Sequence, residues 1–213
     1  MNCCYLCTVF WLELAGAVVG LIYLWLEYKA SVWLWAANVV MPAIYIFVYA
    51  ESGFYADMGI NIYYLVASIY GWAMWRYHRN GKHQELPITR TPRKAIAPLA
   101  AVGAICWGAI LFVLLRWTDS TVPYGDSFTT AASVVALYML SRKYVEQWLV
   151  WFVVDVVCCW LYISKGLYPT AALYGLYALL AIFGYRRWVQ MMKEQPSEDN
   201  DNSVDEDGTI QTA

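Results

Sequence analysis

Three residues within an apolar stretch have the types and spacing to bind a flat organic cation. Trp148, Trp151 and Asp155 follow one another at i, i+3 and i+7, which places them on one face of a helix. Indole rings one turn apart can hold a flat cation, and a carboxylate on the same face can compensate its charge. No Lys or Arg lies within the stretch to pair with Asp155. The pattern predicts a binding site, with a protonated Asp155 bonded to a neighbouring helix as the alternative.

Other apolar stretches also contain polar side chains that could contact a ligand. Glu13 is a second carboxylate, placed either in the hydrocarbon or near its hydrated surface. Asn38 and Asn61 add uncharged polar groups, while Tyr174 and Tyr177 share a helix face with small residues. We expect Asn38, Asn61 and Tyr174 to hydrogen-bond the polar end of a ligand. Stripes of this kind are also typical of helix packing, so both interpretations stay open here.

The composition indicates a membrane protein. The 213 residues are 61% apolar, 17% aromatic and only 14% charged, whereas a soluble domain carries about 25% charged residues. The 12 Trp and 18 Tyr suit a membrane–water interface. This composition excludes a disordered chain, a secreted disulfide scaffold and a basic nucleic-acid-binding protein.

Seven stretches are long and apolar enough, or nearly so, to cross the hydrocarbon, which takes about 20 residues. The predicted fold class is therefore all-α, a polytopic protein with seven transmembrane helices. The fifth stretch is short and could be extended to Tyr144. The expected spans are Phe10–Leu26, Ser31–Ala50, Phe54–Trp75, Ile96–Trp117, Ser127–Leu140, Glu146–Ile163 and Pro169–Trp188.

The positions of Lys and Arg predict how these spans are oriented, because cytoplasmic loops carry more of both. If the connection after the third span is cytoplasmic, 12 of the 14 basic residues lie inside. Only Arg116 and Lys165 then lie outside, together with the acidic loop Thr118–Asp126. The predicted topology has the N-terminus outside and the C-terminus in the cytoplasm.

The sequence repeats itself at a fixed offset, the one that takes Trp35 to Trp148, with nine identities in a stretch without gaps. The offset relates spans two and three to spans six and seven. It predicts two parallel three-helix repeats, about 10–77 and 127–190, joined by a linker helix at about 96–117. Parallel repeats occur in transporters with a substrate site between them; a duplicated bundle without a pathway is the alternative. The matching residues are Trp35/Trp148, Val40/Val153, Tyr49/Tyr162, Gly53/Gly166, Tyr55/Tyr168, Tyr64/Tyr177, Ile69/Ile182, Gly71/Gly184 and Trp75/Trp188.

The remaining features give little support to other functions. The pair Cys4-x-x-Cys7 has no second pair or nearby His, so we expect no metal and no cofactor. We find no phosphate-binding Gly loop and no catalytic motif, and we therefore expect no enzyme. Seven acidic residues after Lys193 predict a disordered tail over 193–213, following a transmembrane domain over 1–192. A membrane scaffold or sensor is the weaker alternative to a transporter, and no nucleic-acid partner is expected.

Two motifs resemble the nicotinamide riboside transporter family, PnuC. One runs from Glu146-Gln-Trp148-x-x-Trp151 through Lys165-Gly-Leu-Tyr168 to Gly184-Tyr-x-x-Trp188, and the other is Tyr70-Gly-Trp-x-x-Trp75. The resemblance covers roughly residues 10 to 190. It implies a bacterial inner-membrane protein with a three-plus-one-plus-three arrangement, similar to full-length SWEET sugar transporters. It also implies a homotrimer and facilitated diffusion, with the substrate trapped inside by phosphorylation.

Carried over residue by residue, the resemblance assigns the paired Trp of span six to Trp148 and Trp151. It also places Gln147 and Asp155 on the helix that provides polar substrate contacts. Asn is expected at the position of Asp155 in many nicotinamide riboside carriers, and related proteins carry thiamine. The resemblance therefore leaves nicotinamide riboside and thiamine open as substrates, since both present a flat cationic ring.

Overall fold

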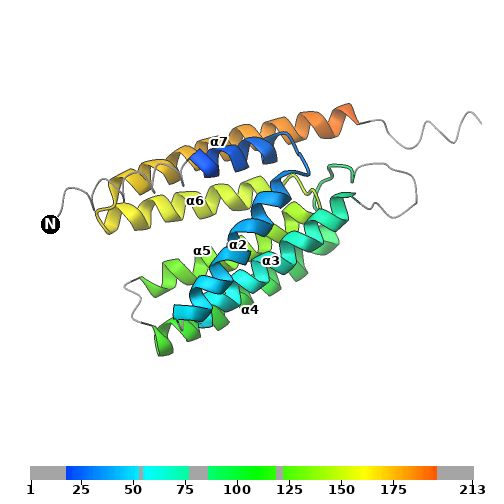
Figure 1. Ribbon diagram of the computed structural model, residues 1–213. Coiled ribbons are helices and arrows are strands. Elements are labelled where there is room, and N and C mark those ends of the chain that lie inside the picture. Colours follow the sequence, from blue (N-terminus) through cyan, green and yellow to red (C-terminus); the bar gives the residue numbers. More distant parts are fainter. Residues whose placement is uncertain (1–17, 53–54, 77–85, 119–121, 196–213) are drawn as a thin grey trace, which may run out of the picture.

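The structure, a computed structural model, describes residues 18–52, 55–76, 86–118 and 122–195 (Figure 1). Within these ranges the chain forms seven helices and one isolated β-bridge, between Thr89 and Tyr144. The all-α prediction is confirmed. The helices are Val18–Tyr28 (the N-terminal helix), α2 (Leu34–Ser52), α3 (Tyr55–Arg76), α4 (Arg93–Trp117), α5 (Pro123–Ser141), α6 (Gln147–Ser164) and α7 (Tyr168–Glu194).

Helix α5 is extended at its N-terminal end, whereas the sequence predicted an extension at its C-terminal end. It begins at Pro123, four residues before the predicted start, because proline suits the first turn of a helix. It ends at Ser141 and does not reach Tyr144, since Lys143 adopts a positive φ of 52° that closes the helix. At the other end of the chain, α7 continues to Glu194, two residues beyond the predicted domain boundary at 192.

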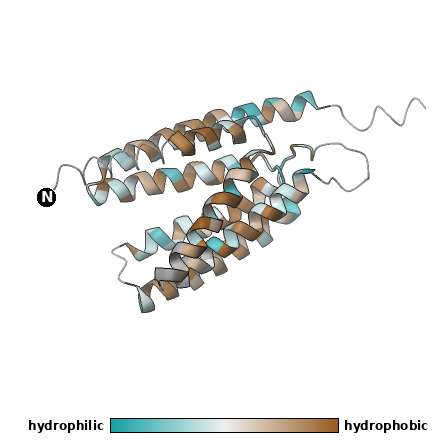
Figure 2. Cartoon of the chain, viewed as in Figure 1, coloured by the Kyte–Doolittle hydropathy of each residue, from teal (hydrophilic) through white to brown (hydrophobic). Residues whose placement is uncertain are grey.

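The helices pack in neighbouring pairs, α2 with α3, α4 with α5 and α6 with α7, and α5 also contacts α3 and α6. The N-terminal helix lies along α7 (Figure 1), where Gly20 approaches the hydroxyl of Tyr177. Hydrophobic residues predominate along the helices (Figure 2), many large hydrophobic side chains are exposed, and α4 has no buried residue at all. By length and composition, α4 and α6 can each cross a membrane.

Two sets of residues related by the repeat offset make the same packing contact. In each set the ring of one Trp covers a Gly on the neighbouring helix and meets a second Trp edge-on. The ring centroids are 5.6 Å apart at 87° in the first set and 5.8 Å apart at 84° in the second. The sets are Trp35, Gly71 and Trp75, and Trp148, Gly184 and Trp188.

The second Trp of each set also reaches across to the other half of the chain. The indole nitrogen of Trp75 donates to the carbonyl of Leu140 at 3.3 Å, and that of Trp188 donates to the carbonyl of Glu27 at 2.9 Å. Glu27 and Leu140 are themselves related by the repeat offset. The two halves therefore exchange equivalent hydrogen bonds across their interface.

Substituting the two glycines under these rings is expected to destabilise the fold. A Cβ on Gly71 would overlap the ring of Trp35, and one on Gly184 would lie 2.6 Å from that of Trp148. Overpacking of this kind costs about 1–3 kcal/mol, so G71A and G184A should lower the thermal unfolding midpoint in detergent. G59A on α3 and G175A on α7 are matched controls, since their Cβ atoms meet open space or ordinary contacts. Equal midpoints for all four variants would contradict the packing described here.

Candidate functional site

A central chamber of about 460 Å³ lies between the N-terminal helix and helices α2, α3, α5, α6 and α7. Its size is within the range of small-molecule sites, about 300–1,000 Å³. Seven of the nine site residues expected from the sequence line it, drawn from four helices. These are Asn38, Asn61, Trp148, Trp151, Asp155, Tyr174 and Tyr177.

A smaller outer chamber of about 250 Å³ adjoins the central one, next to the first turn of α5 and the last turn of α6. Several side chains line both chambers, so together they form one continuous lining. Hydroxyls of α5 line the outer chamber, and three of them donate to carbonyls of their own helix three or four residues earlier. The shared residues are Tyr64, Ser133, Trp151, Asp155 and Tyr174.

Asp155 lies at the junction of the two chambers. Its side chain is nearly buried, and no Lys or Arg of the described residues forms a salt bridge with it. Trp151 lies one helical turn earlier and also borders both chambers. An unpaired carboxylate beside an indole in a cavity is suited to a ligand that carries positive charge on a flat ring.

The two tryptophans of α6 have different surroundings. Trp148 is 1% exposed, with one ring face against Gly184 and an edge-on contact to Trp188. Trp151 is less buried, and the indole nitrogens of both residues have no hydrogen-bond partner among the described residues. Trp148 lines the central chamber and Trp151 lines both chambers, so Trp151, the less buried ring, offers more of its surface to a ligand.

A second carboxylate, Glu27, lies in the wall of the central chamber and was not among the predicted site residues. Glu27 is 1% exposed and accepts hydrogen bonds from Gln147 at 2.9 Å and from the hydroxyl of Tyr23. Asn38 donates to Tyr23 at 3.3 Å. Gln147 does not line the chamber itself, and it contacts Glu27 through the hydrogen bond to its carboxylate. The remaining expected residue, Glu13, lies outside the described residues.

Tyr174 presents its ring to both chambers in a fixed position. It stacks on Tyr162 with centroids 5.2 Å apart at 18°, and it meets Tyr177 edge-on at 5.8 Å. Tyr177 lines the central chamber and contacts Gly20 of the N-terminal helix. Aromatic contacts of this kind hold the side of the cavity that α7 provides.

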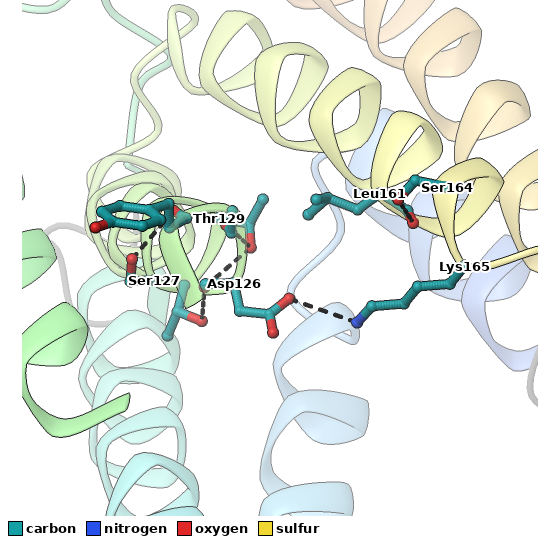
Figure 3. Close-up of polar contacts among 9 residues, drawn as sticks. Asp126, Ser127, Thr129, Leu161, Ser164 and Lys165 are labelled. Carbon is teal, nitrogen blue, oxygen red and sulfur yellow. Dashed lines mark hydrogen bonds and ion pairs between the residues drawn. The ribbon is translucent and has the colours of Figure 1, made fainter. Parts of the chain in front are cut away.

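An ion pair lies at the edge of the outer chamber (Figure 3). Lys165, at the end of α6, is 3.9 Å from Asp126 in the first turn of α5, and each side chain is about one-third exposed. Just inside it, Leu161 approaches Gly125 so closely that a Cβ there would lie 2.7 Å from its side chain. The two helices thus meet at this end of the cavity. Within the described residues no group of His, Cys, Asp and Glu could hold a metal ion.

These features define a class of protein: an all-helical membrane protein with apolar outer faces around an aromatic and acidic cavity, as in small-molecule transporters. Over residues 10–190 the chain matches the family described as nicotinamide mononucleotide transporter, and it belongs to that family. The family consists of transporters and not enzymes. The resemblance drawn from the sequence motifs is confirmed.

Individual relatives agree with this assignment. The chain is 22% identical over 211 residues to the nicotinamide riboside transporter PnuC of Escherichia coli (strain K12), covering 88% of each chain. It is 27% identical over 191 residues to the riboflavin/roseoflavin transporter RibM of Streptomyces davaonensis, covering 84% of this chain and 85% of RibM. The crystal structure of the vitamin B3 transporter PnuC shares the fold, with a TM-score of 0.66 at 22% identity over 87% of this chain and 83% of that one.

Proposed function

We propose that this protein transports nicotinamide riboside across the bacterial inner membrane. The observation that carries the proposal is the unpaired Asp155 beside Trp151 in a cavity of ligand size, since nicotinamide riboside presents a flat cationic ring. Relatives named nicotinamide riboside transporters match 86–88% of the chain. Transport is by facilitated diffusion, with phosphorylation inside the cell trapping the substrate.

Riboflavin is a second candidate substrate, because RibM is among the relatives. Riboflavin is uncharged and larger, so it would use the aromatic lining more than the carboxylates. Thiamine is a third, since it also presents a cationic ring. The sequence resemblance suggests thiamine, whereas none of the relatives reported above is named for it.

The architecture that we propose for transport is two parallel three-helix repeats, joined by α4, that rock against each other around the cavity. The matched contacts of Trp35 and Trp148, and the exchanged hydrogen bonds of Trp75 and Trp188, support this arrangement. The transmembrane domain ends with α7, and the remaining acidic residues form a cytoplasmic tail. By family resemblance the protein forms a homotrimer.

The proposed orientation places the N-terminus outside and the C-terminus in the cytoplasm. The bridge from Thr89 to Tyr144 and the pair Arg90–Glu146 hold the basic connection against the α5–α6 turn, so these basic segments share one end. Lys165 and Asp126 lie at the opposite end. This separation follows the excess of Lys and Arg expected on the cytoplasmic side.

Binding to purified protein tests the proposed substrate. Nicotinamide riboside, thiamine and riboflavin are titrated in detergent and followed by calorimetry, with nicotinamide mononucleotide as the phosphorylated comparison. We expect saturable binding of nicotinamide riboside and much weaker binding of the mononucleotide, whose phosphate would face Asp155 and Glu27. Binding of riboflavin or thiamine alone would leave the assignment as a transporter in place and would change the proposed substrate.

The ion pair at the outer chamber is expected to restrict access to the cavity. Cys158 is a free thiol that lines this chamber, so its reaction with a bulky charged thiol reagent reports opening. An exposed ion pair contributes only about 0–1 kcal/mol, so K165A should accelerate labelling of Cys158 severalfold without unfolding the protein. Peptide mass spectrometry measures the rate at Cys158, and K193A on the last turn of α7 is the control. An unchanged rate in K165A would contradict a gating role.

A further inference from the structure

The central chamber contains a polar cluster that stacking at Trp151 and Asp155 does not use. Its members form one hydrogen-bonded chain across three helices: Asn38 donates to Tyr23, and Tyr23 and Gln147 both donate to the carboxylate of Glu27. The Gln147 contact is 2.9 Å long, and Glu27 is 1% exposed. The cluster therefore holds a carboxylate in a fixed position in the wall of the cavity.

The fold itself does not require these polar side chains. At the repeat offset, Glu27 corresponds to Leu140 and Gln147 to Leu34. Both leucines are fully buried in the hydrophobic core. Glu27 and Leu140 accept the same type of indole hydrogen bond, but through backbone carbonyls that any residue provides. One half of the molecule thus makes these contacts with apolar residues, so the carboxylate and amide serve another purpose.

One acceptor of the cluster has no donor among the described residues. Oε1 of Gln147 is buried with no hydrogen-bond partner among the described residues, and none of them forms a salt bridge with Glu27. A buried acceptor without a donor costs about 1–3 kcal/mol, and more when it is charged. Because Glu27 borders the central chamber, ligand hydroxyls in that chamber can donate to it.

We propose that Glu27 is a specificity-determining residue that binds the hydroxyl-bearing end of the substrate, while Trp151 and Asp155 bind its flat ring. The inference rests on the proposed function for its substrate and adds the residue that recognises the sugar. Asp155 shares its surroundings with the rings of Trp151 and Tyr174 in both chambers, whereas Glu27 borders the central chamber alone. Glu27, the carboxylate that does not border the outer chamber, is thus the one surrounded by hydrogen-bonding groups.

The test compares two ligands with the same cationic ring, nicotinamide riboside and 1-methylnicotinamide, which lacks the sugar. Dissociation constants are measured by calorimetry for the wild-type protein and for Glu27→Gln. A hydrogen bond to a charged group corresponds to roughly a tenfold or greater change in affinity. We expect Glu27→Gln to weaken the binding of nicotinamide riboside by at least tenfold and the binding of 1-methylnicotinamide by less than threefold. Equal weakening of both ligands, or of neither, would overturn the proposal.

A second variant keeps the test decisive if Glu27→Gln folds poorly. Glu27→Leu combined with Gln147→Leu reproduces the pair Leu140 and Leu34 from the other half of the molecule, and it should show the same selective loss. Glu194→Gln, an exposed substitution at the end of α7, is the control and should change neither affinity.

Riboflavin and lumiflavin, which share a ring system but differ in the hydroxylated side chain, form a second pair of ligands. If the wild-type protein binds riboflavin and not nicotinamide riboside, the substrate proposal fails while Glu27 is still tested. If Glu27→Gln then weakens the binding of riboflavin but not that of lumiflavin, the role of Glu27 is supported. Parallel changes in affinity for both flavins overturn it.

Discussion

Replacing Asp155 by Asn is expected to weaken the binding of nicotinamide riboside by at least tenfold. The substitution keeps the size of the side chain and one carbonyl acceptor, so it removes the charge and little else. Asp155 is 8% exposed, and no described Lys or Arg pairs with it. A close charge pair that is withdrawn from water contributes about 1.5–7 kcal/mol where it has been measured. Binding of the ligand's pyridinium ring should therefore depend strongly on this carboxylate.

Titration calorimetry of Asp155→Asn with a charged and an uncharged ligand separates charge from shape. Riboflavin has no fixed positive charge, so any binding of riboflavin should change by less than threefold. Glu146→Gln is the matched control, because this carboxylate lies just before α6 and contacts Thr91, away from the cavity. Unchanged affinity for nicotinamide riboside would contradict a role for the charge of Asp155 in binding.

The helices and one face of the cavity could be predicted because both depend on local sequence patterns. Long apolar runs locate the spans, and the spacing of Trp151 and Asp155 places both on the side of α6 that borders the chambers. The repeat offset also pointed to Gly71 and Gly184, which meet their tryptophans in the same way.

Glu27 could not be predicted because its burial depends on residues far away in the chain. Beside Tyr28 and Lys29, at the end of an apolar run, a Glu is indistinguishable from one at the hydrated membrane surface. Burial of Glu27 results from Gln147, in the second half of the chain, and from the packing of the N-terminal helix along α7. A comparison with Leu140 at the repeat offset is the one signal in the sequence that marks Glu27 as different.

The packing of Trp148 on Gly184 could not be predicted for a related reason. Periodicity gives the direction in which a side chain points, but it does not reveal what already occupies that space. Gly184 belongs to the next helix and has no side chain, so the ring of Trp148 rests directly on the backbone of α7. Trp35 rests on Gly71 in the same way, so the Trp at this position packs against a glycine in each half, and Trp148 also lines the central chamber.

Alanine substitutions should therefore separate the two tryptophans of α6. Trp148→Ala is expected to lower the free energy of unfolding by about 3–5 kcal/mol, the cost of removing a fully buried aromatic ring. Trp151→Ala should leave the unfolding midpoint nearly unchanged and weaken ligand binding by at least tenfold, because its ring borders both chambers. Thermal unfolding in detergent and calorimetry of nicotinamide riboside measure the two effects on the same samples.

Trp35→Ala is the matched control for packing, since its ring makes the same contact with Gly71 and does not line the chamber. It should destabilise the protein about as much as Trp148→Ala does. Trp151→Phe tests the other ring more finely, because it retains an aromatic face and removes the indole nitrogen that has no partner among the described residues. Partial loss of affinity in Trp151→Phe would assign part of the binding to that N–H group. If Trp148→Ala instead kept its stability and lost binding, the two rings would act on the ligand as a pair, and the distinction between packing and binding drawn from Gly184 would be wrong.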